Sequence, residues 1–418
     1  MLEYFKIKNF KSILDEKIDF KTNQRLPNHY NNEDSEENYF FKKNGKKYIP
    51  INAFWGANAS GKTNIVKAFD IFKKVVLHGN LFYNFYPNKL LNNASNTIFE
   101  LCANINNNDY TYSIEYNDRT IIKEELKFKK EVIFSISKYE KIFKNLEGGK
   151  DSNQIFTFLS RILKEYPSLN SKMEEFYDFL TKKLRILLTN ELPTGLAIDL
   201  LTDGNTFDNK NIQIACDRIA SVLKNFDISI SGIKFDRKQE NIQDNTIFDK
   251  YNLDDFYVTA NIETKTLKLD SLISYHKNSL NELIPFNFKW DESQGTQILF
   301  GLIGVILKTF DDGSVLIIDE LERSLHPLII ISIIRMFKSK YWNKNNSQLI
   351  FSTHNTDILD GNVLRTFEIN IVEKTLKNGT KIKNLSNFFG RNGKKVRNIS
   401  NFRKQYLDGI YGGIPFPM

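Results

Sequence analysis

The residues with the clearest chemical potential form the segment GANASGKT, residues 56–63. Glycines, a lysine and a hydroxyl residue at this spacing are typical of a P-loop, which wraps its backbone N–H groups around phosphate oxygens. Lys62 would neutralise charge on the β- and γ-phosphates, and the Thr63 hydroxyl would hold Mg²⁺. The segment predicts a nucleoside triphosphate site. Its expected contacts are Gly56, Asn58, Ser60, Gly61, Lys62, Thr63 and Asn64.

A second chemical signal is the segment SVLIIDE, in which four apolar residues precede two carboxylates. The apolar run predicts a buried parallel strand, and ligands of open α/β sheets bind at the carboxyl ends of such strands. Asp319 would hold Mg²⁺ through water, and Glu320 could orient and deprotonate an attacking water. Alone this pattern is weak, because apolar strands that end in acidic residues are common.

Three further segments carry residues of chemical interest. DESQGT stands before an apolar helix pattern, so Ser293 and Gly295 would place a hydroxyl and backbone amides at a helix N-terminus, which attracts anions. LERSLHP follows the two carboxylates directly, and its Pro327 suits the first turn of a helix. QLIFSTHN predicts another buried strand that ends at His354. A histidine in isolation is more often structural than catalytic.

In this order the segments resemble the ATP-binding-cassette ATPase head of the SMC-like, RecF-like and OLD-like branch. The matching patterns are GxNxSGKT, ESxGT, four apolar residues before DE, LERSLHP and STHN. The chain is most similar to the AAA-type ATPases of bacterial anti-phage and abortive-infection systems, such as Septu, PARIS and AbiL-like systems. FKIKNFKSI near the beginning and YLDGIYGGIPFP near the end also resemble that branch, so the resemblance covers residues 1–130 and 285–418. ESQGT in place of the transporter signature LSGGQ favours the SMC-like branch.

The resemblance implies an ATPase that requires Mg²⁺. Glu320 would be the general base, His354 would sense the γ-phosphate, and Lys62 would complete the catalytic set. Thr63 and Asp319 would hold the metal. The glutamine that usually follows the P-loop helix in this superfamily has no counterpart that the sequence identifies.

The resemblance also implies a homodimer, and it leaves a higher oligomer as an alternative. In such heads ATP lies between the P-loop of one subunit and the signature serine of the other, so Ser293 and Gly295 would contact the γ-phosphate across a two-fold interface. Ser324, in the loop after the general base, would lie near the partner's site. Weaker candidates for contacts to adenine are Asn9, Phe10 and Lys11.

The surrounding pattern predicts an α/β fold. INAFW before the P-loop favours a strand, and apolar residues at 65, 66, 69, 72 and 76 favour a helix after it. Alternation over 97–128 predicts an antiparallel meander, and helical spacing between 153 and 226 predicts three or more amphipathic helices. We expect a P-loop ATPase head with a mixed or parallel sheet, split into residues 1–130 and 285–418 around a mainly helical insertion with short strands at 131–284.

Composition excludes several classes of protein. The 418 residues are 41% hydrophobic and 26% charged, which is ordinary for a globular chain and excludes collagen-like and disordered ones. Cys102 and Cys216 are too far apart in sequence to suggest a metal or redox pair, and they exclude a disulfide framework. The longest apolar run, ten residues at 298–307, is well short of the roughly 18 needed to span a bilayer. With no secretory segment at the start, we expect a cytoplasmic protein.

The net charge of +8 is confined to one segment. Residues 371–418 carry ten Lys or Arg and two Asp or Glu, whereas the charges of the preceding 370 residues balance. A basic surface for nucleic acid and a compositional bias without selection for binding are equally compatible with this surplus.

Two functions remain open. The first is the ATPase subunit of an antiviral defence complex, which controls a separate effector, a nuclease or toxin from the same operon. It is favoured because only 64 residues follow His354, too few for a Toprim nuclease, and because the five histidines and two cysteines form no HNH or zinc pattern. The second is a RecF-like, ATP-dependent DNA clamp in repair or recombination. A transporter subunit is disfavoured by the signature, and GTP by the lack of an NKxD motif.

Overall fold

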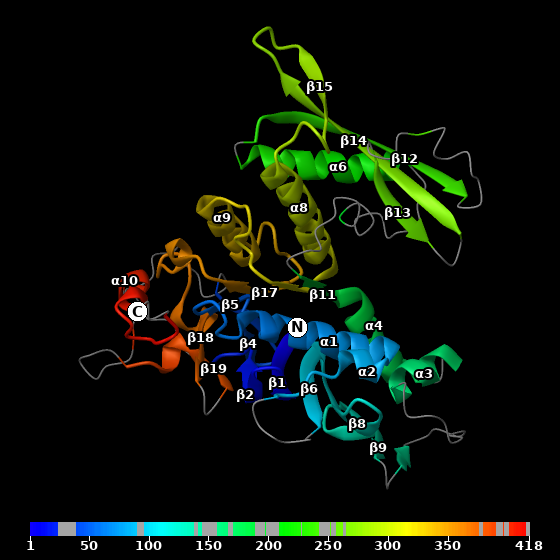
Figure 1. The fold of residues 1–418 in the computed structure, drawn as a ribbon, viewed down its shortest axis with the longest axis vertical. Helices are drawn as coiled ribbons and strands as arrows, with labels where there is room; N and C mark the ends of the chain where they lie inside the picture. Colours follow the sequence, from blue (N-terminus) through cyan, green and yellow to red (C-terminus); the bar gives the residue numbers. More distant parts are fainter. Residues whose placement is uncertain are drawn as a thin grey trace. The chain divides into compact units, whose positions relative to one another are not determined.

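The computed structural model describes residues 1–23, 39–89, 96–137, 141–143, 157–165, 170–188, 197, 209–226, 228–241, 251, 256–261, 265–375, 379–389, 396 and 401–414. The chain divides into two units, each with its own sheet (Figure 1). The first unit comprises Met1–Leu188, Asp312–Glu322 and Ile330–Met418, and the second comprises Thr189–Asp311 and Arg323–Ile329.

The first unit is built on a large mixed sheet. In the described residues its order is β10-β9-β8-β7-β6-β1-β2-β19-β18-β5-β17-β16-β11. In one part of the sheet, the neighbouring strands β18, β5, β17, β16 and β11 are parallel. In another part, the neighbouring strands β2, β1, β6, β7, β8, β9 and β10 are antiparallel. The strands are β1 (Leu2–Phe10), β2 (Ile13–Asp19), β5 (Ile51–Trp55), β6 (Thr97–Ile105), β7 (Asn108–Tyr116), β8 (Ile121–Phe128), β9 (Glu131–Ser137), β10 (Lys141–Phe143), β11 (Leu184–Leu187), β16 (Val315–Ile318), β17 (Gln348–Thr353), β18 (Ile369–Thr375) and β19 (Gly379–Asn384).

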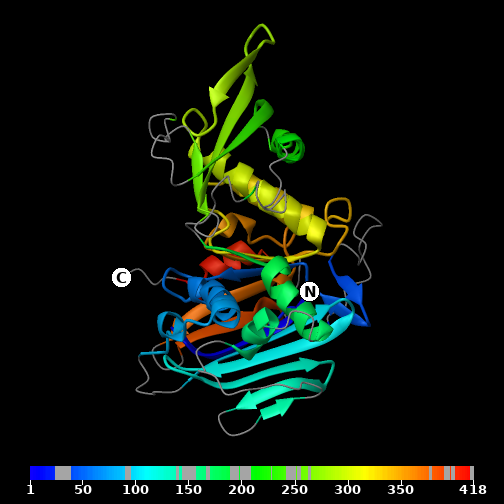
Figure 2. The same cartoon turned by 90° about the vertical axis from the view of Figure 1, so that its right-hand side faces the viewer.

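This sheet confirms the predicted mixed architecture. The predicted meander over 97–128 is present as β6, β7 and β8, and it continues through β9 and β10. Figure 2 shows these strands side by side, in cyan to teal. The central parallel strands, β5, β17 and β16, are short and fully buried, which explains their near-continuous apolar sequence.

The helix after the P-loop supports one face of this sheet. It is α1 (Lys62–His78), and it contacts β1, β11, β17 and α3 (Figure 1). Its predicted apolar stripe is buried, and the Phe69 ring stacks on Phe5 of β1 with 4.1 Å between centroids. Further helices that lie wholly or mainly in this unit include α2 (Leu81–Asn84), α3 (Phe158–Glu165), α4 (Ser171–Asp178), a π-helical turn (Phe179–Lys183), α9 (Pro327–Lys338), which begins at the predicted proline, and α10 (Phe402–Leu407).

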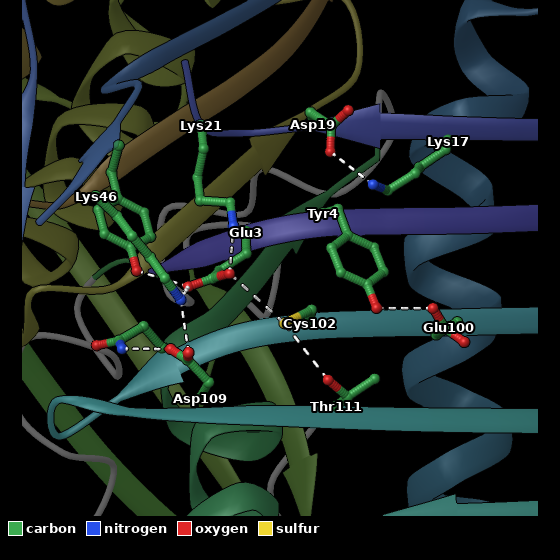
Figure 3. A network of polar contacts seen from close by, with 12 residues as sticks. Glu3, Tyr4, Lys17, Asp19, Lys21, Lys46, Glu100, Cys102, Asp109 and Thr111 are labelled. Carbon is green, nitrogen blue, oxygen red and sulfur yellow. Dashed lines mark hydrogen bonds and ion pairs between the residues drawn. The ribbon is translucent and has the colours of Figure 1, made fainter. Parts of the chain in front are cut away.

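A buried carboxylate ties the first strand to a neighbouring hairpin, β3 (Phe41–Lys43) and β4 (Lys46–Tyr48). The Glu3 side chain is 4% exposed and accepts hydrogen bonds from Lys21 Nζ at 2.5 Å, Lys46 Nζ at 2.7 Å and the Tyr48 hydroxyl at 2.7 Å (Figure 3). Lys46 Nζ also lies 2.5 Å from Asp109 Oδ2 on β7. Because a buried charge is stable only when it is paired, this network holds the hairpin against the end of the sheet.

The second unit combines an antiparallel sheet with helices. Its strands pair in the order β12-β14-β13, with β15 also on β14, and α6 packs on β12. No helix that the structure describes is long and apolar enough to cross a membrane. The elements are α6 (Asn209–Lys224), β12 (Ile230–Asn241), β13 (Tyr257–Asn261), β14 (Thr266–Lys277), β15 (Leu283–Asn287) and α8 (Gln294–Asp312).

Two strands of the second unit are longer than the sequence suggested. β12 and β14 have 12 residues each, and they pair along their length. Arg237 on β12 and Asp270 on β14 form a buried, two-bond ion pair, so positions that look polar in the sequence belong to the covered face. The predicted bounds of the insertion, 131–284, stay a prediction, and parts of that range lie outside the described residues.

Candidate nucleotide-binding site

Three neighbouring parallel strands deliver the predicted residues to one edge of the first unit's sheet. β5 lies beside β17, and β17 lies beside β16. The P-loop follows β5, His354 follows β17, and Asp319 and Glu320 follow β16. Because the strands are parallel, all three segments emerge at the same edge, where open α/β sheets bind ligands. Segments separated by up to about three hundred residues in the sequence therefore meet in the fold.

The P-loop is held tightly against the strands behind it. Lys62 Nζ donates to the carbonyl oxygens of Gly56 at 2.6 Å and Ala57 at 3.0 Å. A Cβ added to Gly56 would lie 2.2 Å from the Val372 carbonyl oxygen on β18, so only glycine fits there. Asn58 is exposed at the tip of the loop, whereas Lys62 is buried at its base.

The loop has features that fit a triphosphate. It leads into the N-terminus of a 17-residue helix, where unpaired N–H groups and the helix dipole attract anions. The Ser60 hydroxyl is buried and has no hydrogen-bond partner among the described residues. Since buried polar groups are rarely left unpaired, this hydroxyl is available to a bound ligand.

The donors available for Mg²⁺ are few. Among the residues that the structure describes, no three His, Cys, Asp or Glu side chains gather to hold a metal ion. The Thr63 hydroxyl and the Asp319 carboxylate are oxygen donors of the kind that Mg²⁺ uses together with water and substrate phosphates. The residues present thus fit a metal that arrives with its nucleotide.

The two carboxylates after β16 are organised by the neighbouring strand. Ser352 Oγ on β17 donates to Asp319 Oδ1 at 2.5 Å and accepts the Glu320 backbone N–H at 2.8 Å. Glu320 has a φ of 53°, in the left-handed region that non-glycine residues rarely adopt. The chain therefore turns sharply at the predicted general base, which is a common feature of functional sites.

Acidic side chains face the P-loop lysine. Burial lowers the pKa of Lys62, while the carboxylates of Glu322, Glu320 and Asp319 act in the opposite direction, Glu322 most strongly. The lysine is thus electrostatically coupled to the whole acidic segment after β16.

His354 makes a contact that the sequence reasoning missed. Its Nδ1 lies 2.8 Å from Glu322 Oε1, and the same oxygen accepts the His354 backbone N–H at 2.6 Å. Glu322 lies inside LERSLHP, beside residues that we singled out. Nothing in the local pattern distinguishes it from a surface glutamate, because its partner is 32 residues away.

Two hydroxyl residues behind the P-loop were also missed. Asn64 Nδ2 donates to Ser12 Oγ at 2.7 Å, and Ser12 Oγ lies 2.7 Å from Thr380 Oγ1. Thr380 Oγ1 in turn donates to the Ser60 carbonyl oxygen at 2.9 Å. Two hydroxyl groups, from Ser12 in the turn between β1 and β2 and from Thr380 on β19, thus connect Ser60 in the loop to Asn64 on α1.

Of the three adenine candidates, Lys11 alone is placed toward solvent. Phe10 is fully buried, and the Asn9 side chain accepts the Asn88 N–H at 3.0 Å and donates to Asn96. Lys11 Nζ lies 4.8 Å from the ring centroid of Tyr86, which is 40% exposed. A half-exposed aromatic ring beside Lys11 is a feature that sequence reasoning did not identify.

The predicted signature and loop residues meet within the second unit. Ser293 Oγ accepts the Thr296 N–H at 3.1 Å, so it caps α8 as expected. A Cβ added to Gly295 would lie 3.2 Å from the carbonyl oxygen of Ser324, whose φ is 59°. Ser293, Gly295 and Ser324 therefore form one local cluster.

The segment around Gly413 contacts the P-loop. The Ala57 N–H donates to the Gly413 carbonyl oxygen at 2.6 Å, and the Tyr406 hydroxyl donates to the same oxygen at 2.9 Å. This contact gives residues 406–413 a structural role. Much of the basic region at 371–418 lies outside the described residues, so its use as a nucleic-acid surface stays a prediction.

Comparisons with known proteins place the chain in a family. A family model described as "AAA domain, putative AbiEii toxin, Type IV TA system" matches residues 51–360. No curated protein matches the chain. An SMC head domain from Thermotoga maritima is 14% identical with a TM-score of 0.43, the alignment covering 92% of this chain and 98% of that one. An SMC head bound to the C-winged helix domain of ScpA is 13% identical with a TM-score of 0.45, over 91% and 96% of the two chains. Because the family model matches well over half of the sequence, the chain belongs to this AAA-domain family.

Proposed function

We propose that this protein is a Mg²⁺-dependent ATPase that dimerises head to head around two ATP molecules. The observation that carries the proposal is the order β5-β17-β16, which puts a P-loop, a histidine and two carboxylates at one sheet edge. A P-loop alone indicates nucleotide binding, whereas a P-loop beside a carboxylate pair has the parts for hydrolysis. Membership of an AAA-domain family supports the same reading.

Each residue then has a role in hydrolysis. Glu320 removes a proton from water as the water oxygen attacks the γ-phosphorus, and the bond to the bridging oxygen breaks to give ADP and phosphate. Lys62 and the loop amides balance the negative charge of the phosphates, and His354 contacts the γ-phosphate. Thr63 and Asp319 would hold Mg²⁺, which would supply positive charge at the phosphate oxygens.

The proposed dimer uses the cluster of the second unit. Ser293 and Gly295 at the N-terminus of α8 would reach the γ-phosphate held by the other subunit, with Ser324 nearby. Support comes from the exposed position of Ser293 at a helix N-terminus, where backbone amides favour an anion. ATP would then join two copies across a two-fold axis.

We also propose a cytoplasmic role in bacterial antiviral defence, in which the ATP-bound and ADP-bound dimers hold or release a separate effector from the same operon. The family description, which refers to a "putative AbiEii toxin" and a "Type IV TA system", supports this setting. Co-expression with the product of the adjacent gene should yield a stable complex. A protein that is toxic alone and binds no such product would contradict the effector role.

The experiment that tests the ATPase proposal compares three variants by phosphate release and by light scattering during gel filtration. Lys62→Ala should lose nucleotide binding. Glu320→Gln should bind ATP, fail to hydrolyse it and accumulate as a dimer. Ser293→Arg should bind ATP as a monomer and fail to dimerise. Normal hydrolysis by Glu320→Gln would exclude Glu320 as the base, and ATP-dependent dimers of Ser293→Arg would exclude the sandwich.

A second candidate, an ATP-dependent DNA clamp, is favoured by the basic surplus in residues 371–418. A clamp should bind duplex DNA only with ATP, and the logarithm of its affinity should fall steeply with the logarithm of salt concentration. Absence of ATP-dependent binding at low salt would reject this candidate.

A further inference from the structure

We propose that Glu322 is the positioning residue of His354: its carboxylate keeps the proton on Nδ1, fixes the ring, and leaves Nε2 to meet the terminal phosphate of the nucleotide. This inference rests on the proposed function, because it assigns a partner to a residue of that same site. It concerns a residue that neither the sequence motifs nor the family match singles out.

The geometry between the two residues is specific. A single oxygen, Glu322 Oε1, lies 2.6 Å from the His354 backbone nitrogen and 2.8 Å from His354 Nδ1. A carboxylate can only accept hydrogen bonds, so Nδ1 must carry a proton whenever this contact is made. The neutral ring then has its lone pair on Nε2, and the protonated ring has its second N–H there. The contact to both backbone and ring also restricts the side-chain rotation of His354.

The backbone brings Glu322 to this position. Glu320 turns through its left-handed conformation, and the Leu321 N–H donates to the Ser352 carbonyl oxygen at 3.2 Å. The segment after β16 therefore crosses the end of β17, the strand that His354 follows. The contact is thus a product of the same turn that sets the predicted base.

Burial argues for a role in the site beyond local stability. The Glu322 side chain is 8% exposed, whereas that of His354 is 59% exposed. Glu322 Oε2 is buried and has no hydrogen-bond partner among the described residues. A buried carboxylate oxygen without a partner costs free energy, so stability alone does not favour glutamate here. The carboxylate is also the acidic group that acts most strongly on the P-loop lysine.

The test combines kinetics with a spectroscopic readout that needs no hydrolysis. The protein has five histidines, so His354 can be assigned in two-dimensional ¹H–¹⁵N spectra by comparison with His354→Ala. In the nucleotide-free, full-length protein at about pH 8, where histidine rings are mostly neutral, His354 should be the Nδ1–H tautomer. In Glu322→Ala the Nε2–H tautomer should become the major form. An Nε2–H tautomer in the unmodified protein would overturn the proposal without any variant of Glu322.

Kinetics test whether Glu322 acts through His354. Glu322→Ala should lower kcat about 10- to 100-fold, the range expected for a lost hydrogen bond to a charged group, with KM for ATP changed less than about threefold. Glu322→Gln keeps an acceptor oxygen and should recover most of kcat. His354→Ala combined with Glu322→Ala should be no slower than His354→Ala alone, because residues that act as a unit are not additive.

The controls distinguish a failure of the Glu322 role from a failure of the proposed ATPase function. Glu125→Ala, which removes a glutamate paired with Lys127 on β8 at 2.5 Å, should leave kcat unchanged. Additive losses in the double variant, or full loss in Glu322→Gln, would overturn the positioning role. If the unmodified protein hydrolyses no ATP, the proposed function fails, yet the tautomer measurement still decides whether Glu322 orients the ring.

Discussion

Thr380 lies where a side chain at Gly61 would begin. A Cβ on Gly61 would be 2.1 Å from Thr380 Oγ1, and Gly61 has a φ of 110°. The same hydroxyl donates to the Ser60 carbonyl oxygen, 320 residues earlier in the chain. β19 therefore supports the P-loop from behind, and the shape of the loop depends on a strand that the P-loop motif does not include.

This contact predicts that one added methyl group at Gly61 weakens ATP binding. Gly61→Ala should reduce ATP affinity at least about 100-fold, because it combines a steric overlap with a backbone conformation that L-residues avoid. Isothermal titration with ATP measures the loss. Gly232→Ala on β12 is the matched control, since nothing lies within 4 Å of its Cβ and its φ is ordinary. An equal effect of both substitutions would show that the loop does not depend on this contact.

Ser352 offers a second test, because its hydroxyl joins the Asp319 carboxylate to the backbone of Glu320. Ser352→Ala removes the hydroxyl between Asp319 Oδ1 and the Glu320 N–H. A hydrogen bond to a charged group contributes about 1.5–3 kcal/mol, so kcat should fall about 10- to 100-fold. Phosphate release measures kcat, and ATP affinity without Mg²⁺ should be unchanged.

The control for Ser352 is Ser221→Ala on α6, whose hydroxyl donates to a carbonyl of its own helix. It should leave kcat within about twofold, as expected of a surface substitution. If Ser352→Ala lowers ATP affinity without Mg²⁺ as much as it lowers kcat, Ser352 supports the loop and not the carboxylates.

The sequence predicted the parts of the site that depend on local pattern. Gly61 and Lys62 belong to one short motif, and Asp319 follows an apolar run, so residue type and spacing suffice to find them. It could not predict Thr380 or Glu322, whose roles come from contacts with residues far away in the chain. Such contacts follow from the order of the strands in the sheet, which a single sequence does not specify.

The same limit applies to the second unit. Arg237 and Asp270 look like solvent-facing charges in the sequence, and their pairing across β12 and β14 makes those positions part of a covered face. The sequence predicted short strands in this region, whereas β12 and β14 have 12 residues each. Polar residues can extend a buried face when they satisfy one another.

Tyr86 provides a test of base recognition. Lys11 Nζ lies over its half-exposed ring. The next residue in the chain, Ser12, accepts a hydrogen bond from Asn64. If adenine stacks here, Tyr86→Ala should weaken ATP binding about 5- to 100-fold, because stacking on an aromatic side chain contributes about 1–3 kcal/mol per base. The affinity for inorganic triphosphate, which has no base, should not change.

Tyr83→Ala is the control for Tyr86, since Tyr83 is an exposed tyrosine of the same segment whose ring packs on Phe82. It should bind ATP normally. Equal weakening of ATP and triphosphate binding by Tyr86→Ala would indicate a disturbed P-loop and would contradict base stacking.

Two ion pairs of the second unit predict costs of different size for the same kind of substitution, Asp to Ala. Asp270 accepts hydrogen bonds of 2.6 and 2.8 Å from Arg237, and both side chains are at most 2% exposed. Asp311 accepts hydrogen bonds of 2.6 and 2.8 Å from Arg218, and both of these side chains are more than 40% exposed. Asp270→Ala leaves a buried guanidinium with its main partner removed and should destabilise the unit by about 3–5 kcal/mol. Asp311→Ala should cost about 0–1 kcal/mol, because solvent screens an exposed pair. Hydrogen exchange of the β12 and β14 amides reports the difference directly, and equal exchange in the two variants would mean that burial does not set the strength of these pairs.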